Sequence, residues 1–190
     1  MARYLVCVTG ASGAIYGLRL ISALCASGAE VHAAASPWGS RVVLEETGRD
    51  FRQWCDSTGV AAVHDPADLA APVSSGSFRL AGTIVVPCTM ATAAAIATGN
   101  VRNLVHRAGA VALKEGWPLI VVPREAPLSV PDLRNLLTLA EAGAAIIPAS
   151  PGFYHHPATI EDLVDHLVGK IMDRLGIDHE LFERWKGSIK

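Results

Sequence analysis

VTGASGAIYG, at residues 8–17, connects an expected strand to an expected helix. The run 4–8 is short, apolar and β-branched, which is typical of a buried strand, and residues 14–26 have leucines and an isoleucine spaced for one buried helical face. A strand that enters a helix through small residues leaves N–H groups unpaired at the positive end of the helix dipole, where a phosphate binds well. Glycine permits close approach, and Ser12 adds a hydroxyl donor. The alternative is a tight connection that binds no ligand.

The glycine spacing separates this loop from two better-known phosphate-binding loops. The glycines follow G-x-x-G-x-x-x-G, whereas a dinucleotide-binding loop needs G-x-G-x-x-G and a Walker A loop ends in G-K-S or G-K-T. The next expected strand, residues 30–35, ends at Ser36 and not at an acidic residue that would hold a ribose diol. The loop therefore favours a phosphate-bearing mononucleotide over NAD.

The composition limits the classes of protein. The 190 residues suffice for one domain, and with 51% hydrophobic and 18% charged residues we expect much surface to be buried between subunits. The net charge of −2 and the lack of a basic stripe argue against nucleic-acid binding. No apolar stretch is long enough to span a membrane and no signal peptide is evident, so we expect a cytoplasmic protein without a membrane partner. The four cysteines lack regular spacing and are expected to be reduced core residues: Cys7, Cys25, Cys55 and Cys88.

Strands and helices alternate along most of the chain. Strands are expected at 4–8, 30–35, 61–64, 83–87, 119–122 and 144–148. Helices are expected at 14–26, 38–47, 90–98, 107–115, 130–142 and 160–175, with partly helical structure at 49–60 and a loop at 65–78. This alternation predicts a single domain over 1–190 with a three-layer α/β/α, Rossmann-like (flavodoxin-like) fold and a parallel sheet. Ligands of such folds bind beyond the carboxyl ends of the strands.

Two motifs at expected strand ends carry reactive side chains. Cys88 opens a helix whose dipole would lower the thiol pKa, which makes a nucleophile conceivable. No histidine lies nearby in the sequence, so a small packing residue under a ligand ring is favoured. Arg124 and Glu125 follow the strand at 119–122. The guanidinium suits a phosphate or a carbonyl oxygen, and the Glu125 carboxyl can transfer a proton if burial raises its pKa. The alternative is a surface ion pair between the two neighbours.

Further along the chain, cationic and aromatic residues suggest an anion site but no metal site. Arg107 and Lys114 are two turns apart on one helix face, where two cations without a nearby acid form either an anion clamp or a solvated face. The adjacent His155 and His156 have no carboxylates or cysteines at metal-ligand spacing. Tyr154 offers a phenol to a phosphate or a ring to an apolar ligand.

Seven segments, taken together and in order, resemble the UbiX-type flavin prenyltransferases, within the wider group of homo-oligomeric FMN-binding flavoproteins. The resemblance covers nearly the whole chain. Each segment alone is a weak indication, but their combination is highly specific. The segments are TGASGA at 9–14, VVPCT at 85–89, RA at 107–108, LKE at 113–115, VPREAPL at 122–128, PGFYHHP at 151–157 and RW at 184–185.

The resemblance implies a metal-independent transferase. Family members bind reduced FMN and transfer a dimethylallyl group from dimethylallyl phosphate, or the diphosphate, to N5 and C6 of the flavin. The product, prenylated FMN, is the cofactor of UbiD-type decarboxylases in ubiquinone biosynthesis and aromatic-acid breakdown. The resemblance also implies a homododecamer with active sites shared between subunits, in which the C-terminal helix and tail, about 160–190, pack on neighbouring subunits.

The resemblance also implies roles for individual residues. FMN would be bound by Gly10, Ala11, Ser12, Ser36, Thr89, Met90, Ala91, Thr92 and Arg124. The prenyl donor would be held by Arg107, Lys114, Tyr154 and Lys170, with Trp185 closing the pocket. Proton transfer would fall to Glu125 near the phosphate, and to Ser12 and Glu46 for the proton lost from flavin C6.

Some positions depart from the family pattern, and two other functions stay open. Lys170 stands where many relatives have Arg, and Gly116-Trp117 stands where Arg-Arg is usual, which leaves the choice between monophosphate and diphosphate donor open. The first alternative function is an FMN-dependent cysteine decarboxylase, although such enzymes use an early histidine where this chain has Tyr16. The second is a non-catalytic FMN-binding accessory subunit of an aromatic-acid decarboxylase.

Overall fold

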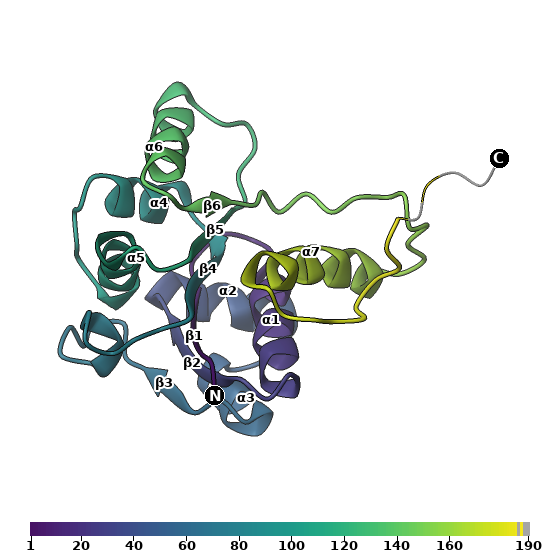
Figure 1. Cartoon of the computed structure of the whole chain (residues 1–190), viewed down its shortest axis with the longest axis horizontal. Coiled ribbons are helices and arrows are strands. Elements are labelled where there is room, and N and C mark those ends of the chain that lie inside the picture. The colour runs from purple at the N-terminus through teal and green to yellow at the C-terminus, as the bar shows by residue number, and fades with distance from the viewer. Residues whose placement is uncertain (186, 188–190) are drawn as a thin grey trace.

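A six-stranded parallel sheet forms the centre of the molecule (Figure 1). The computed structural model describes residues 1–185 and 187. The strand order is β3-β2-β1-β4-β5-β6, so the direction of winding reverses between β1 and β4, where ligands of such sheets bind. The strands are β1 (Arg3–Val8), β2 (Glu30–Ala35), β3 (Ala62–His64), β4 (Gly82–Cys88), β5 (Leu119–Pro123) and β6 (Ala145–Ile146).

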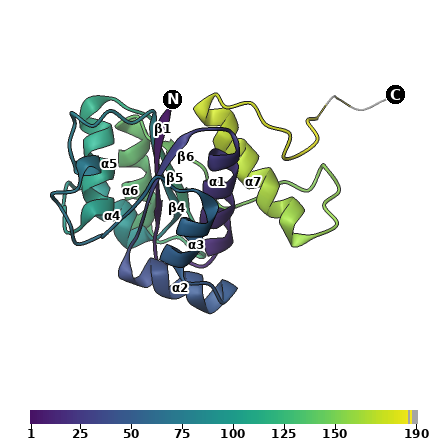
Figure 2. The same ribbon diagram turned by 90° about the horizontal axis from the view of Figure 1, so that it is seen from below.

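Helices cover both faces of the sheet, which confirms the predicted three-layer fold (Figure 2). One core cluster lies between the sheet and α1 (Ala14–Ala26), α2 (Pro37–Thr47), α3 (Phe51–Thr58) and α7 (Ile160–Leu175). The other lies between the sheet and α4 (Met90–Ala97), α5 (Leu104–Glu115) and α6 (Val130–Glu141). The fully buried side chains of Leu24 and Ile171 belong to the first cluster, and those of Leu104 and Leu139 belong to the second.

Two elements differ from the prediction for identifiable reasons. Helix α5 begins one turn before the expected residue 107, because the Asn103 side chain accepts the N–H of His106 at 3.0 Å and caps the helix there. Strand β6 is shorter than the expected 144–148 because it is an edge strand, although the N–H groups of Ile147 and Ala149 still donate to carbonyls of β5. The chain continues from β6 as an extended segment, residues 147–159, which we call the strap.

The strap, α7 and the tail at 176–185 form an arm that extends beyond the sheet (Figure 1). Helix α7 is fixed to α1 by the guanidinium of Arg19, whose Nε lies 2.6 Å from Asp165 Oδ1. The tail turns back along α7, so that the ring of Trp185 comes within 6.0 Å of the Tyr154 ring in the strap. The expected packing of this region on neighbouring subunits partly concerns residues 186 and 188–190, which lie outside the described residues.

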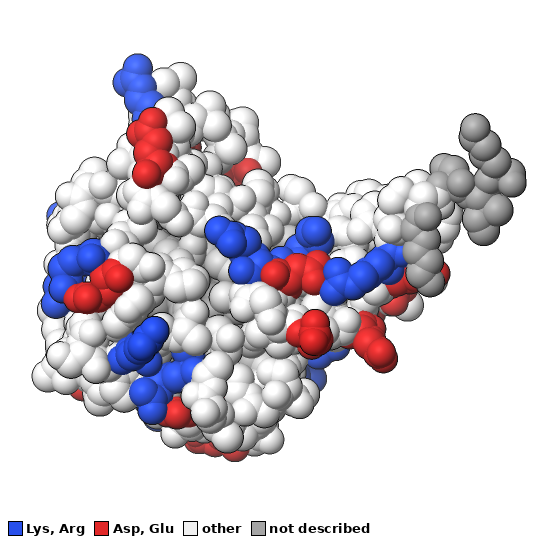
Figure 3. Space-filling model, in the orientation of Figure 1, with Lys and Arg blue, Asp and Glu red and all other residues white. Residues whose placement is uncertain are grey.

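Charged side chains form small mixed groups on the face in Figure 3, and broad areas between them carry neither sign. Several large apolar side chains are exposed instead. On α6 they are Val130, Leu133 and Leu137, each more than half exposed, and on the strap Phe153 is 70% exposed. None of the helices in the described part of the chain has the length and apolar character needed to span a membrane.

Candidate functional site

The ends of β1, β4 and β5 meet in what we call the strand-tip corner, formed by residues 10–12, 88–92 and 124–125. The hydroxyl of Thr9 joins two of the strands, because it donates to the carbonyl of Pro87 at 2.7 Å and accepts the N–H of Thr89 at 2.9 Å. The N–H of Arg124 donates to the carbonyl of Cys88 at 3.3 Å and adds the third strand. The structure therefore brings the expected polar strand ends to one edge.

The glycine loop at 10–12 is packed tightly and keeps its backbone donors available. A Cβ atom on Gly10 would lie 2.6 Å from Cβ of Trp38, so only glycine fits against the start of α2. Among the described residues, no hydrogen bond is made by the N–H groups of Gly10, Ala11 or Ser12. The exposed guanidinium of Arg124 lies beside this loop, since its Nε donates to the carbonyl of Ser12 at 3.1 Å.

The N-terminus of α1, expected to bind a phosphate, already holds a carboxylate. The Glu46 carboxylate accepts the N–H of Ala14 at 2.8 Å and that of Gly13 at 3.0 Å. A carboxylate in this position uses the helix dipole and repels a second anion. The expectation that these N–H groups receive the ligand phosphate is therefore wrong, while the loop at 10–12 keeps its free donors.

Two other helices begin at the same edge and offer better anion sites. Ser36 caps α2 by accepting the N–H of Gly39 at 3.0 Å, and Thr89 caps α4 by accepting the N–H of Thr92 at 3.1 Å. Neither helix has an acidic residue in its first turn. A ligand phosphate therefore meets a positive helix end without a competing carboxylate at α2 and α4.

The two reactive side chains of the strand-tip corner differ in accessibility. Cys88 is fully buried, its Sγ donates to the carbonyl of Thr89 at 3.3 Å, and burial raises the pKa of its thiol. This shift is opposite to the dipole effect considered from the sequence, so Cys88 is a packing residue and not a thiolate nucleophile. Glu125 is exposed and accepts the N–H of Ala126 at 3.1 Å. No ion pair joins Glu125 to Arg124 within the described residues.

The cationic pair on α5 lies on the other face of the sheet from α1 and α7. Arg107 is partly buried, and its Nε donates to the carbonyl of Ser74 at 3.0 Å. Lys114 is exposed and forms an ion pair with Glu115, so the expectation of two cations without a nearby acid is wrong for Lys114. Strand β5, whose five residues span roughly 15 Å, separates the end of α5 from Arg124 along the chain.

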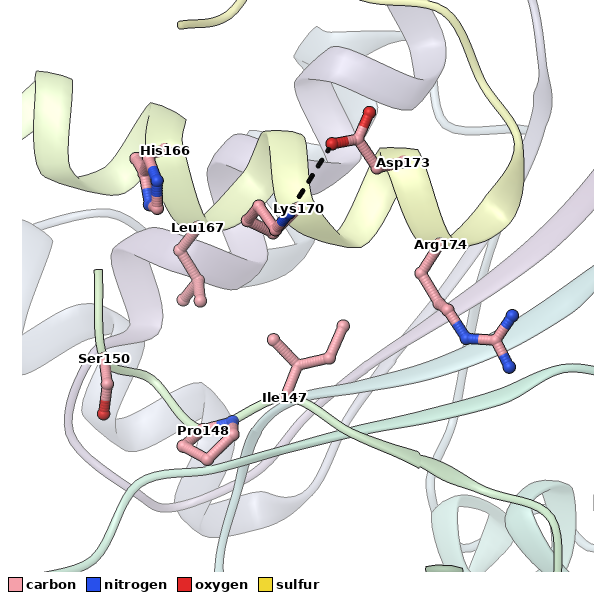
Figure 4. A pocket seen from close by; sticks show the side chains of 8 residues that line it. All are labelled: Ile147, Pro148, Ser150, His166, Leu167, Lys170, Asp173 and Arg174. Carbon is pink, nitrogen blue, oxygen red and sulfur yellow. Dashed lines mark ion pairs between the residues drawn. The ribbon is translucent and has the colours of Figure 1, made fainter. Parts of the chain in front are cut away.

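The remaining expected substrate residues lie on the arm. The hydroxyl of Tyr154 is 3.0 Å from Nε2 of His166, and its ring faces Trp185. Lys170 lines a cavity of about 580 Å³ between α7 and the strap, and its Nζ lies 4.0 Å from Oδ2 of Asp173 (Figure 4). The rest of the cavity wall is formed by apolar, polar and charged side chains: Ile147, Pro148, Ser150, His166, Leu167 and Arg174.

A single chain thus carries the expected site residues in three places: the strand-tip corner, α5 and the arm. His166 is not among the residues expected from the sequence, yet it is buried under the strap and hydrogen-bonded to Tyr154. The signal available in the sequence was its spacing, because His166 precedes Lys170 by one helical turn and shares its face.

A glycine loop, two helix N-termini without acids and an arginine at one sheet corner define an α/β protein that binds a phosphate-bearing ligand. A family model described as "Flavoprotein" matches residues 1–172. The chain belongs to the flavoprotein family and, within it, to the UbiX flavin prenyltransferases, with which it shares more than 40% of its residues over nearly its whole length.

One such relative, flavin prenyltransferase UbiX of Alkalihalophilus pseudofirmus, is 44% identical over 94% of this chain and 93% of its own. The structure of AnUbiX (PadA1) in complex with FMN and dimethylallyl pyrophosphate is 42% identical, covers 99% of both chains and has a TM-score of 0.95. The dodecameric FMN-dependent UbiX-like decarboxylase from Escherichia coli O157:H7 is 42% identical, with 97% and 100% coverage and a TM-score of 0.93. A peptidyl-cysteine decarboxylase is only 16% identical, which shows a shared fold alone.

We predict that Glu46→Ala lowers the melting temperature by about 2–4 °C, because the first turn of α1 loses its carboxylate cap. Glu45→Ala is the matched control on the same helix, since Glu45 is exposed and, among the residues described, pairs only with Arg41 one turn away. Thermal unfolding followed by circular dichroism measures both. Equal effects of the two substitutions would contradict the capping role.

Proposed function

We propose that this protein is a flavin prenyltransferase that transfers a dimethylallyl group from dimethylallyl phosphate to reduced FMN and releases prenylated FMN. The proposal is supported above all by more than 40% identity to flavin prenyltransferases over nearly the whole chain, together with the phosphate-binding features of the strand-tip corner. Reduced FMN supplies the two atoms that accept the prenyl group, N5 and C6. The protein binds both substrates, stabilises the leaving phosphate and moves protons.

The strand-tip corner fits FMN by its set of donors. Three N–H groups at 10–12 without a partner among the described residues, two helix N-termini without acids and the Arg124 guanidinium lie at one edge of the sheet, where a ligand phosphate can bind. The absence of a side chain at Gly10 lets the start of α2 pack directly on the loop, next to these N–H groups. We assign FMN binding to Gly10, Ala11, Ser12, Ser36, Thr89, Met90, Ala91, Thr92 and Arg124.

The leaving group of an allylic phosphate determines what else the site needs. When the carbon–oxygen bond breaks, the electron pair goes to the phosphate, and fixed cations stabilise this charge. Water would trap the allylic cation, so the pocket must also be dry, and aromatic faces stabilise the cation further. We assign the phosphate to Arg107, Lys114, Tyr154 and Lys170, and the covering aromatic side chain to Trp185.

Carboxylates and a hydroxyl move the protons. Glu125 follows Arg124 at the end of β5 and is exposed in the single chain. We assign to its carboxyl the proton given to the departing phosphate once the ligands and a neighbouring subunit bury it. The Glu46 carboxylate is held at the first turn of α1 next to Ser12, and we assign to these two residues the removal of the proton from flavin C6. A carboxylate that two N–H groups hold is well oriented for this transfer.

We propose that the site is completed by neighbouring subunits in a cytoplasmic homododecamer. Arg107 lies on the opposite face of the sheet from Lys170, so one chain cannot direct both at one phosphate. Exposed apolar side chains on α6 and the strap supply surface for subunit contacts. The product, prenylated FMN, passes to a UbiD-type decarboxylase, and the donor is dimethylallyl phosphate or its diphosphate.

The proposed activity is tested by measuring the mass of the flavin product by mass spectrometry. Anaerobic incubation with reduced FMN and dimethylallyl phosphate should yield a flavin heavier by one five-carbon prenyl unit, and a parallel incubation with the diphosphate identifies the donor. Bovine serum albumin with the same reagents is the control for uncatalysed alkylation. A flavin of unchanged mass with both donors would reject the transferase in favour of an accessory flavin-binding subunit.

Glu125→Gln should lower turnover by about 10²–10⁴-fold while FMN stays bound, because the amide keeps the shape of the side chain but holds no transferable proton. Glu141→Gln on α6 is an exposed control outside the proposed site. Single-turnover mass spectrometry measures the chemistry, and flavin absorbance after gel filtration measures binding. Wild-type turnover in Glu125→Gln would remove the proton role.

Mixed assemblies test the shared site. Arg107→Ala and Lys170→Ala subunits should each be inactive, but their co-expressed equal mixture should recover about a quarter of wild-type activity, because random assembly joins an intact residue from each chain at that frequency. Arg107→Ala mixed with Lys114→Ala is the matched control. Both residues lie on α5 of one chain, so every α5 carries one lesion and no activity returns. Equal activity of the two mixtures would contradict a site shared in this way.

A further inference from the structure

His166 is a buried polar residue of α7 that the proposed reaction does not yet use. Its ring is 6% exposed and touches two parts of the strap, with Nδ1 at 3.2 Å from the N–H of Gly152 and Nε2 at 3.0 Å from the hydroxyl of Tyr154. The tail covers the ring from another side, because the Phe182 ring lies 4.8 Å away.

The hydrogen bonds fix which nitrogen of His166 carries the proton. The N–H of Gly152 can only donate, so Nδ1 must accept and is unprotonated. A neutral imidazole then carries its proton on Nε2, which donates to the oxygen of Tyr154. Because the phenol oxygen accepts this bond, its own O–H proton remains free to donate to a further acceptor. The Tyr154 side chain is 43% exposed, so such an acceptor can reach it.

We propose that His166 is a positioning residue, whose Nε2–H holds the Tyr154 phenol so that its O–H donates to the phosphate of the prenyl donor. This inference rests on the proposed function, in which Tyr154 binds that phosphate. Without His166 the phenol would rotate freely and would donate to any nearby acceptor, so the phosphate site would lose a preset donor.

The surroundings keep His166 neutral, as this role requires. Burial is the largest cause that lowers its pKa, and the neighbouring His155 and Lys170 lower it further. The His155 ring stacks on His166 at 4.7 Å with an interplanar angle of 5°, and from the tail Arg184 is held by Asp173. Protonation would place a proton on Nδ1 against the donor of Gly152. The bond from Gly152 is therefore present at neutral pH and lost as the pH falls below the ordinary histidine value of about 6.5. Its loss frees the strap segment that carries Tyr154, although Nε2–H can still donate to the phenol.

Substitution of His166 by Asn or by Gln tests its two hydrogen bonds separately. The amide of Asn reaches the position of Nδ1, and the amide of Gln reaches the position of Nε2. His166→Gln should therefore keep the donor to Tyr154, and His166→Asn should lose it. We expect His166→Asn and Tyr154→Phe each to raise the Kd for dimethylallyl monophosphate about tenfold, the typical effect of one charge-assisted hydrogen bond, and His166→Gln to raise it less than about threefold.

The measurement is titration calorimetry of dimethylallyl monophosphate into protein loaded with oxidised FMN, which reports binding without turnover. In the Tyr154→Phe background, His166→Asn should add less than about a twofold effect, because a residue that acts through Tyr154 has nothing left to position. Melting temperatures identify variants that fail to fold.

If His166→Asn fails to fold, the affinities of the wild type and His166→Gln for the monophosphate are compared between pH 7.5 and 5.5. The affinity should fall more steeply in the wild type, beyond the effect of titrating the phosphate itself, which is common to both proteins.

Several outcomes would overturn the inference. These are equal affinities of the Asn and Gln variants, an additive effect in the double variant, parallel pH profiles of the wild type and His166→Gln, or no binding of the monophosphate by the wild type. Absence of prenylated flavin from the wild type, together with the expected pattern in binding, would reject the proposed transfer reaction and leave the positioning role of His166 in place.

Discussion

Two glycine contacts between the end of β1 and the start of α2 determine how the candidate site is arranged. A Cβ atom on Gly10 would lie 2.6 Å from Cβ of Trp38, and one on Gly39 would lie 2.4 Å from the carbonyl oxygen of Val8. Since neither position has room for a side chain, α2 packs directly on the strand-tip loop. This packing brings the Glu46 carboxylate to the first turn of α1. The protein thus fills one helix end with its own anion and leaves the ligand phosphate to helices that begin without an acid.

Local elements were predictable where one periodic face decided them. The expected helices 14–26 and 160–175 coincide with α1 and α7, whose apolar residues repeat at helical spacing, and the alternation of elements was enough to predict the parallel sheet. Boundaries set by a single side chain were not predictable in the same way. The start of α5 depends on a cap by Asn103, and β6 is an edge strand that pairs with β5 only at Ala145 and Ile146.

The site was predictable as a set of residues but not as a geometry. The resemblance to a family supplied candidate roles, whereas the Glu46 carboxylate reaches Gly13 across 33 residues of sequence, with no local pattern to announce the contact. The resemblance assigns Arg107 and Lys170 to the same substrate, although tertiary packing places their helices on opposite faces of the sheet. His166 escaped notice because a histidine beside the apolar face of a helix is usually a satisfied core residue, and only the folded strap reveals its bond to Tyr154.

Each chain therefore builds separate parts of a site and fixes each part by its own contacts. On α5 the carbonyl of Ser74 orients Arg107. On the arm, the tail packs so closely on α7 that a Cβ atom on Gly169 would lie 2.4 Å from the Phe182 ring, and Asp173 accepts from Arg184 at 2.7 Å. These contacts place Trp185 beside the strap before any neighbour is present. In the proposed assembly, subunit association would need only to bring these preorganised parts together, so the entropy of ordering each side chain would be lost on folding and not again when the substrate binds.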